Sequence, residues 1–226
     1  MKSEEGHDMR QNAKSRHHFL TGLAGTAITV AMASALLAAH TTPALAGAAA
    51  QPGAPGCVTC HGTRGEGASS GVPRLAGQNA DYLDHALSLF KTGARAGAMM
   101  QPIAQNLSDS EMRRLADYFS NQHAALADSG ASASPQLVIA GKQLAEMGAA
   151  DKAACFSCHG AQGKGNGARF PGIAGQPAQF VINRLHEFQA RAQGTAPQPG
   201  TMTAVAATLD ERQIQEAAAY LSQLEP

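Results

Sequence analysis

The chain contains two copies of one five-residue motif, Cys-x-x-Cys-His, at residues 57–61 and 155–159. This pattern is the attachment site of a c-type haem, in which both thiols bond to the porphyrin and the adjacent histidine binds the iron. The sequence has four cysteines, and the two motifs use all of them. We therefore predict two covalently bound haem c groups. The residues that would hold them are Cys57, Cys60, Cys155 and Cys158, with His61 and His159 as iron ligands.

Paired cysteines have two other common uses, a four-cysteine zinc site and a pair of redox-active Cys-x-x-Cys motifs. Neither use gives a reason for a histidine directly after both cysteine pairs. The glycines and the proline that follow each motif also repeat between the two halves of the chain. The repeated surroundings favour two haem sites over a zinc site or a thiol redox centre.

A second axial ligand is expected on each iron, and methionine is the usual one in cytochromes c. Met100 begins the pattern Met-x-x-Ile-x-x-x-Leu, and Met202 begins the equivalent Met-x-x-Val-x-x-x-Leu. Met99 is one residue out of register with this repeat. Methionine also serves as core filling, and we assign Met112 and Met147 to that role. The matching positions predict Met100 and Met202 as the ligands.

Pro73 and Pro171 each lie twelve residues after a predicted histidine ligand. An imidazole that binds a metal through one nitrogen donates its other N–H to an acceptor, commonly a backbone carbonyl. A proline that follows a glycine-rich loop fixes the backbone that could offer such a carbonyl. An ordinary turn proline explains the same residues, and the repeat alone leaves both interpretations open.

The repeat extends well beyond these motifs and indicates an internal duplication. At an offset of 98 residues, the glycines after the two histidines match, and residues 73–80 match residues 171–178. From Met100 onwards the offset is 102, so the second copy has four additional residues. The segment between the copies is rich in Ala, Ser, Gly and Asp, as linkers are. The two homologous domains and the linker between them are predicted at residues 47–123, 135–226 and 124–134.

Both domains are predicted to be all-α, with long glycine-rich loops. Apolar residues recur at helical spacing in residues 80–91 and 178–191, and most clearly in the last helix of each domain. These last helices begin with capping-box pairs, in which a short polar residue precedes Glu or Gln by three positions. The pairs are Ser108 with Glu111 and Asp210 with Gln213.

The two domains differ at their beginnings. A helix is expected at residues 135–147, ahead of the second Cys-x-x-Cys-His motif. Residues 47–56 take the equivalent place in the first domain and contain prolines and glycines, so no helix is expected there.

Residues 1–46 have the features of an export signal. Basic residues precede an apolar run at residues 19–39, and Ala44-Leu45-Ala46 is an A-x-A cleavage site. Because haem is attached to c-type cytochromes outside the bacterial cytoplasm, we predict a signal peptide at 1–46 and a periplasmic protein. The apolar run has about 20 residues, enough to span a bilayer, so an uncleaved membrane anchor is the alternative.

The composition sets limits on function and on stability. The chain has 17 Lys and Arg and 17 Asp and Glu, so it lacks the basic excess of a protein that binds nucleic acid. Small domains rarely bury enough apolar surface unaided. A covalently held porphyrin would supply the missing apolar group.

Both halves resemble class I cytochrome c domains, and their tandem arrangement resembles the two-haem cytochrome c4 family. The resemblance rests on CHG at 60–62 and 158–160, PRLAGQ at 73–78, PGIAGQ at 171–176, and the methionine pattern before the capped last helix. It implies that the Pro73 and Pro171 carbonyls hold His61 and His159. It also implies that Met100 and Met202 complete the iron coordination, with the haems facing each other across a pseudo-twofold interface.

The resemblance implies an electron carrier and not an enzyme, because a six-coordinate His/Met iron has no open position for a substrate. Expected partners are redox proteins of the respiratory chain, namely a quinol-oxidising complex upstream and a terminal oxidase or other reductase downstream. Loose membrane association is compatible with this role. The alternatives are a cytochrome subunit of a larger dehydrogenase and, less favoured, a two-haem peroxidase or sulfur-oxidising enzyme.

Overall fold

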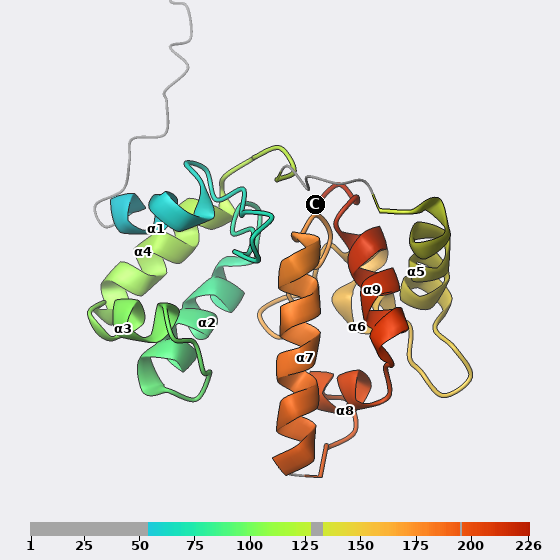
Figure 1. Cartoon of the computed structure of the whole chain (residues 1–226). Helices are drawn as coiled ribbons and strands as arrows, with labels where there is room; N and C mark the ends of the chain where they lie inside the picture. The colour runs from blue at the N-terminus through green and yellow to red at the C-terminus, as the bar shows by residue number, and fades with distance from the viewer. Residues whose placement is uncertain (1–53, 128–132, 195) are drawn as a thin grey trace, which may run out of the picture. The chain divides into compact units, whose positions relative to one another are not determined.

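The computed structural model describes residues 54–127, 133–194 and 196–226, and its regular elements are helices (Figure 1). The only β pairing within these residues consists of isolated bridges, such as that between Ala68 and Val72. The elements are α1 (Ala54–His61), α2 (Ala80–Thr92), α3 (Met100–Gln105), α4 (Asp109–Ser120), α5 (Pro135–Met147), α6 (Phe156–His159), a 3-10 turn η1 (Ala161–Gly163), α7 (Ala178–Gly194), α8 (Met202–Ala207) and α9 (Glu211–Leu221).

The first domain contains α1 to α4, and its core lies where α2 packs against α4. The amphipathic pattern of α4 places Leu115, Ala116 and Phe119 in this core, with Leu83 of α2 opposite them. Val58 of α1 packs against the same cluster. The helix that carries the first Cys-x-x-Cys-His motif is thus anchored on the core of its own domain.

The second domain contains α5 to α9, and α9 packs against both α5 and α7. Ile214 of α9 has no exposed surface and lies at the centre of this core. The close approach of α5 to α9 depends on Gly141, because a Cβ atom there would lie 1.9 Å from the carbonyl oxygen of Glu216. The hydroxyl of Tyr220 donates a hydrogen bond to Glu146 (2.7 Å), which also joins the two helices.

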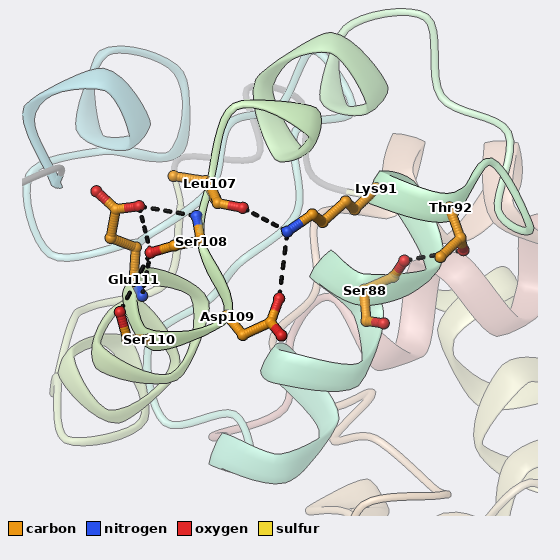
Figure 2. A network of polar contacts seen from close by, with 8 residues as sticks. All are labelled: Ser88, Lys91, Thr92, Leu107, Ser108, Asp109, Ser110 and Glu111. Atoms are coloured by element: carbon orange, nitrogen blue, oxygen red, sulfur yellow. Dashed lines mark hydrogen bonds and ion pairs between the residues drawn. The ribbon is translucent and has the colours of Figure 1, made fainter.

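Both predicted capping boxes are present. At the start of α4, the backbone N–H of Ser108 donates to the Glu111 carboxylate (2.8 Å), and the N–H of Glu111 donates to Ser108 Oγ (3.3 Å) (Figure 2). At the start of α9, Asp210 and Gln213 form the same reciprocal pair at 3.1 and 2.8 Å. Each box satisfies N–H groups that have no partner inside the helix.

The prediction that residues 47–56 contain no helix is wrong for the last three of these residues. No helix was expected within residues 47–56, yet α1 begins at Ala54 and includes Pro55 and Gly56. Proline is tolerated in the first turn of a helix because its missing N–H has no partner there in any case. The proline therefore marks the start of this helix. Residues 47–53 and the predicted signal peptide at 1–46 lie outside the described residues.

The predicted linker is also only partly described, at residues 124–127 and 133–134. Its beginning is held by Arg74, whose guanidinium donates to the carbonyl oxygens of Ala124 (2.6 Å) and Ala125 (2.7 Å). The helices within the described ranges include none that is both long enough and apolar enough to cross a membrane.

Candidate haem sites

Each motif histidine is the last residue of its helix, His61 in α1 and His159 in α6. Nδ1–H of His61 donates a hydrogen bond to the carbonyl oxygen of Pro73 (2.9 Å), and Nδ1–H of His159 donates to that of Pro171 (2.8 Å). A carbonyl only accepts, so the proton is on Nδ1 and the lone pair is on Nε2. Nε2 is therefore the nitrogen that can bind a metal.

The protonation state of both imidazoles also suits a metal ligand. Burial lowers the pKa of His61 and of His159, and the hydrogen bond that each ring donates to a proline carbonyl opposes this shift only in part. The rings are therefore neutral near neutral pH, which is the form that binds a metal ion.

In each domain a glycine-rich loop places the proline carbonyl within hydrogen-bond distance of the histidine ring. Gly67 donates its N–H to the His61 carbonyl (2.8 Å), and Gly165 donates to the His159 carbonyl (2.7 Å). Both glycines have positive φ angles, +85° and +97°. A Cβ atom at Gly67 would lie 2.8 Å from the backbone nitrogen of Arg74. The loop therefore needs glycine here, both for its backbone angle and for its contact with the proline segment.

The cysteines precede these histidines along the same short helical segments. Cys57, Cys155 and Cys158 are partly buried, and Cys60 is exposed. Burial raises the pKa of Cys57 and raises that of Cys155 to about 11. Redox-active cysteines need low-pKa thiolates. Among the described residues, no three His, Cys, Asp or Glu side chains lie close enough together to hold a metal ion. The raised pKa values disfavour the thiol redox alternative, and the separation of the donor side chains disfavours a shared zinc site.

The predicted methionine ligands occupy the same place in both domains. Met100 is the first residue of α3, and Met202 is the first residue of α8. Both are partly buried, whereas Met99 is 73% exposed. The assignment of Met147 to a core is wrong, because it ends α5 and is 76% exposed, whereas Met112 is buried as expected.

The segments that follow the two methionine helices, α3 and α8, are held by equivalent residues of the two domains. Lys91 Nζ donates to the Leu107 carbonyl (2.7 Å), and Gln189 Nε2 donates to the Leu209 carbonyl (2.8 Å). Lys91 and Gln189 match at the 98-residue offset, and the two leucines match at 102. The structure thus fixes the end of α3 and of α8 against the long helix before it.

The residues present fit a covalently held haem c. Each domain offers two thiols for the porphyrin, a neutral imidazole with Nε2 available, and a partly buried thioether. Arg95 lies between α2 and α3 and is buried, and its Nε has no hydrogen-bond partner among the described residues. This unpaired donor favours an anionic group bound nearby. A propionate carboxylate of haem would satisfy such a donor.

Two glutamines for which the sequence predicts no role, Gln78 and Gln176, lie at the contact between the domains. Gln176 is hydrogen bonded to both backbone polar groups of Arg74, and Gln78 is bonded in the same way to Gly172. The repeated Ala-Gly-Gln triplet was the available signal. Sequence alone does not show that each glutamine contacts the other domain.

Comparison with known proteins agrees with this geometry. The Cytochrome c family profile matches residues 44–122 and 138–225. Cytochrome c4 of Azotobacter vinelandii is 34% identical over 189 residues, which cover 78% of this chain and 88% of that protein. The chain belongs to the cytochrome c4 family. The solved Acidithiobacillus ferrooxidans cytochrome c4 matches with a TM-score of 0.66 at 33% identity, covering 74% of this chain and 98% of that one.

The name of a further relative states its redox partner. The protein named "Thiosulfate dehydrogenase electron acceptor" in Stutzerimonas stutzeri is 37% identical over 177 residues, covering 76% of this chain and 81% of that protein. Membership of the cytochrome c4 family, with two Cys-x-x-Cys-His motifs, identifies an all-α electron-transfer cytochrome with two covalent haem c groups.

Proposed function

We propose that this cytochrome is a periplasmic carrier that moves electrons between respiratory donors and a terminal oxidase or reductase, and that it is not itself an enzyme. His61 and Met100 would bind the iron of the first haem, and His159 and Met202 that of the second. The observation that carries the proposal is the same His–Pro hydrogen bond in both domains, combined with a methionine in equivalent position. Such a ligand set leaves no open position on the iron for a substrate.

The residues of the chain would hold each haem in one geometry during electron transfer. When bound, the haem supplies an iron that alternates between its ferric and ferrous states. The thioethers from the two cysteines prevent its loss, and the Pro73 and Pro171 carbonyls fix the orientation and tautomer of the imidazoles. Burial of both histidines, each 6% exposed, limits the access of water to the proximal side.

A thiosulfate-oxidising dehydrogenase is the donor that we favour. The support is the 37% identity to a protein named as the electron acceptor of such an enzyme. A quinol-oxidising complex is the alternative donor, and a subunit role in a larger dehydrogenase is the alternative to a separate carrier. Mixing the oxidised protein with a thiosulfate dehydrogenase and thiosulfate should reduce both haems within seconds. Rapid reduction by a quinol-oxidising complex and none by the dehydrogenase would contradict this choice.

The haem content and coordination are tested by spectroscopy of the purified protein. We expect two haems per chain that resist acid-acetone extraction and give the pyridine haemochrome of haem c. Carbon monoxide should leave the spectrum of the reduced protein unchanged, because both axial positions are filled. A haem that binds carbon monoxide rapidly would show an open position and would favour a peroxidase-like enzyme.

The periplasmic location depends on the predicted signal peptide. Cleavage after Ala46 gives a mature chain that begins at Gly47, and intact-mass measurement with two haems added should show this. Membrane-bound protein that retains residues 19–39 would instead support the anchored alternative.

A further inference from the structure

The peptide group after each key proline is hydrogen bonded on both sides. The carbonyl of Pro73 accepts from His61 (2.9 Å), and the N–H of the same peptide, on Arg74, donates to Oε1 of Gln176 (3.1 Å). In the other domain, the Pro171 carbonyl accepts from His159 (2.8 Å). The N–H of that peptide, on Gly172, donates to Oε1 of Gln78 (3.0 Å).

Each glutamine comes from the domain opposite to the histidine that it reaches through the peptide. Gln176 also donates Nε2–H to the Arg74 carbonyl (3.0 Å), and Gln78 donates to the Gly172 carbonyl (2.5 Å). Both side chains are buried, with 3% and 7% exposed. At the 98-residue offset Gln78 matches Gln176 and Arg74 matches Gly172, so the two contacts are equivalent under the duplication.

This geometry gives a short chemical connection from a glutamine of one domain to the iron ligand of the other. An acceptor on a peptide N–H polarises the amide, so its carbonyl becomes a stronger hydrogen-bond acceptor. A stronger acceptor at Nδ1–H makes the imidazole a more basic ligand. A more electron-donating ligand stabilises ferric iron, and hydrogen bonding around the ligand is one of the factors that set a haem potential.

We propose that Gln78 and Gln176 are crossed positioning residues, each of which lowers the reduction potential of the haem in the other domain. The connection runs from Gln176 through the Pro73–Arg74 peptide to His61, and from Gln78 through the Pro171–Gly172 peptide to His159. The proposal rests on the proposed assignment of these two histidines as iron ligands. It would make each potential depend on contact between the domains, so that loosening the contact raises both.

The simpler role for these glutamines is to hold the domains together, and the pattern of potentials separates the two roles. In the full-length two-haem protein, Gln176→Met removes the amide and keeps the length of the side chain. We expect it to raise the potential of the haem bound by His61 and to leave that of the His159 haem unchanged. Gln78→Met should give the reverse. Spectroelectrochemical titration measures both potentials.

To assign each measured potential to its haem, the same substitutions are repeated in a Met202→His variant. In that variant the second haem titrates at a far lower potential because the thioether is lost. Gln122→Met is the matched control, since Gln122 is a buried glutamine whose Nε2 donates to the carbonyl of Tyr118 (3.1 Å) in its own domain. It should shift neither potential. Gln176→Glu keeps an acceptor for the Arg74 N–H, so it should leave the His61 haem at or below its original potential.

A second measurement does not depend on the potentials. In the diamagnetic reduced protein, Gln176→Met should move the NMR resonance of the His61 Nδ1 proton upfield and leave that of His159 in place. Three results for the reduction potentials would overturn the crossed connection: a shift only for the haem of the domain that carries the substitution, equal shifts for both haems, or no shift. If the unsubstituted protein lacked a His/Met spectrum, the proposed function would fail, whereas intact spectra with unmoved potentials contradict only this inference.

Discussion

At each haem site the histidine donates Nδ1–H to a proline carbonyl, and that bond determines which ring nitrogen can reach an iron. The second ligand that we propose, a methionine, lies about forty positions further along the chain, at the start of a helix of only six residues. The register of that short helix decides whether Met100 or the preceding Met99 is available. Their exposures, partly buried against 73%, favour Met100.

Substitution of the methionines tests this register. Met100→Ala or Met202→Ala should each remove about half of the long-wavelength ferric His/Met absorption and lower one reduction potential, because thioether ligation raises it. Both haems should remain covalently attached through the cysteines. Met99→Ala is the control and should leave the spectrum unchanged. A spectral change on Met99→Ala alone would place the ligand one residue earlier.

Single residues were predictable from sequence where chemistry restricts them to a motif. The cysteines and histidines have a fixed local spacing, and Pro73 and Pro171 repeat at a constant distance from the histidines. The roles of Gln78 and Gln176 were not predictable, because a contact between domains depends on how two folded units meet and leaves no local spacing.

At the scale of helices, local hydrogen-bonding chemistry predicted most of the boundaries. The capping boxes at Ser108 and Asp210, and proline at the first position of α5, mark helix starts that the structure places at the expected residues. The start of α1 differs from the expectation because Pro55 lies in the first turn of the helix, where proline is tolerated. The short helices α3 and α8 carry too few residues for a periodic pattern.

The first capping box has its carboxylate at the third helical position, on Glu111. Hydrogen bonds from Ser108 lower the pKa of Glu111 below its ordinary value of 4.5, whereas the equivalent residue in α9 is Gln213. The stabilisation from the Glu111 carboxylate is therefore complete above pH 4.5 and is lost as the pH falls through its folded-state pKa.

Glu111→Gln should consequently reduce the loss of stability on acidification from about pH 7 to about pH 3, measured as the difference in unfolding free energy between these conditions. Identical acid dependence in Glu111→Gln and the unsubstituted protein would show that the box does not contribute in this way.

The contact between α5 and α9 depends on the absence of a side chain at Gly141. Alanine would place its Cβ 1.9 Å from the Glu216 carbonyl oxygen, which belongs to the backbone of the packed helix and cannot move alone. The helix-propensity gain of about 1 kcal/mol for Gly→Ala is smaller than the cost of separating the helices. Gly141→Ala should therefore destabilise the protein by about 1–3 kcal/mol. Gly194→Ala, with no atom within 4 Å of its Cβ, should be neutral.

At the scale of the whole molecule, the two domains share a haem-binding plan but differ in what covers the last helix. In the second domain α9 is packed by α7 and also by α5. In the first domain α4 is packed by α2, and the described residues include no counterpart of α5. Leu115 and Phe119 are nevertheless buried, so α1 and α2 provide their cover.

The unequal cover predicts unequal stability of the separated domains. Helix α5 contributes the buried Leu144 and Ala145 to the second domain, and burial of each large apolar side chain is worth about 1.5–3 kcal/mol. Residues 131–226, expressed with haem attachment, should therefore unfold at a higher urea concentration than residues 47–130. On separation both domains lose the same glutamine contacts, Gln176 with Arg74 and Gln78 with Gly172, so these contacts do not change the expected order. Equal midpoints would show that α1, α2 and the haem stabilise the first domain as well as α5 stabilises the second.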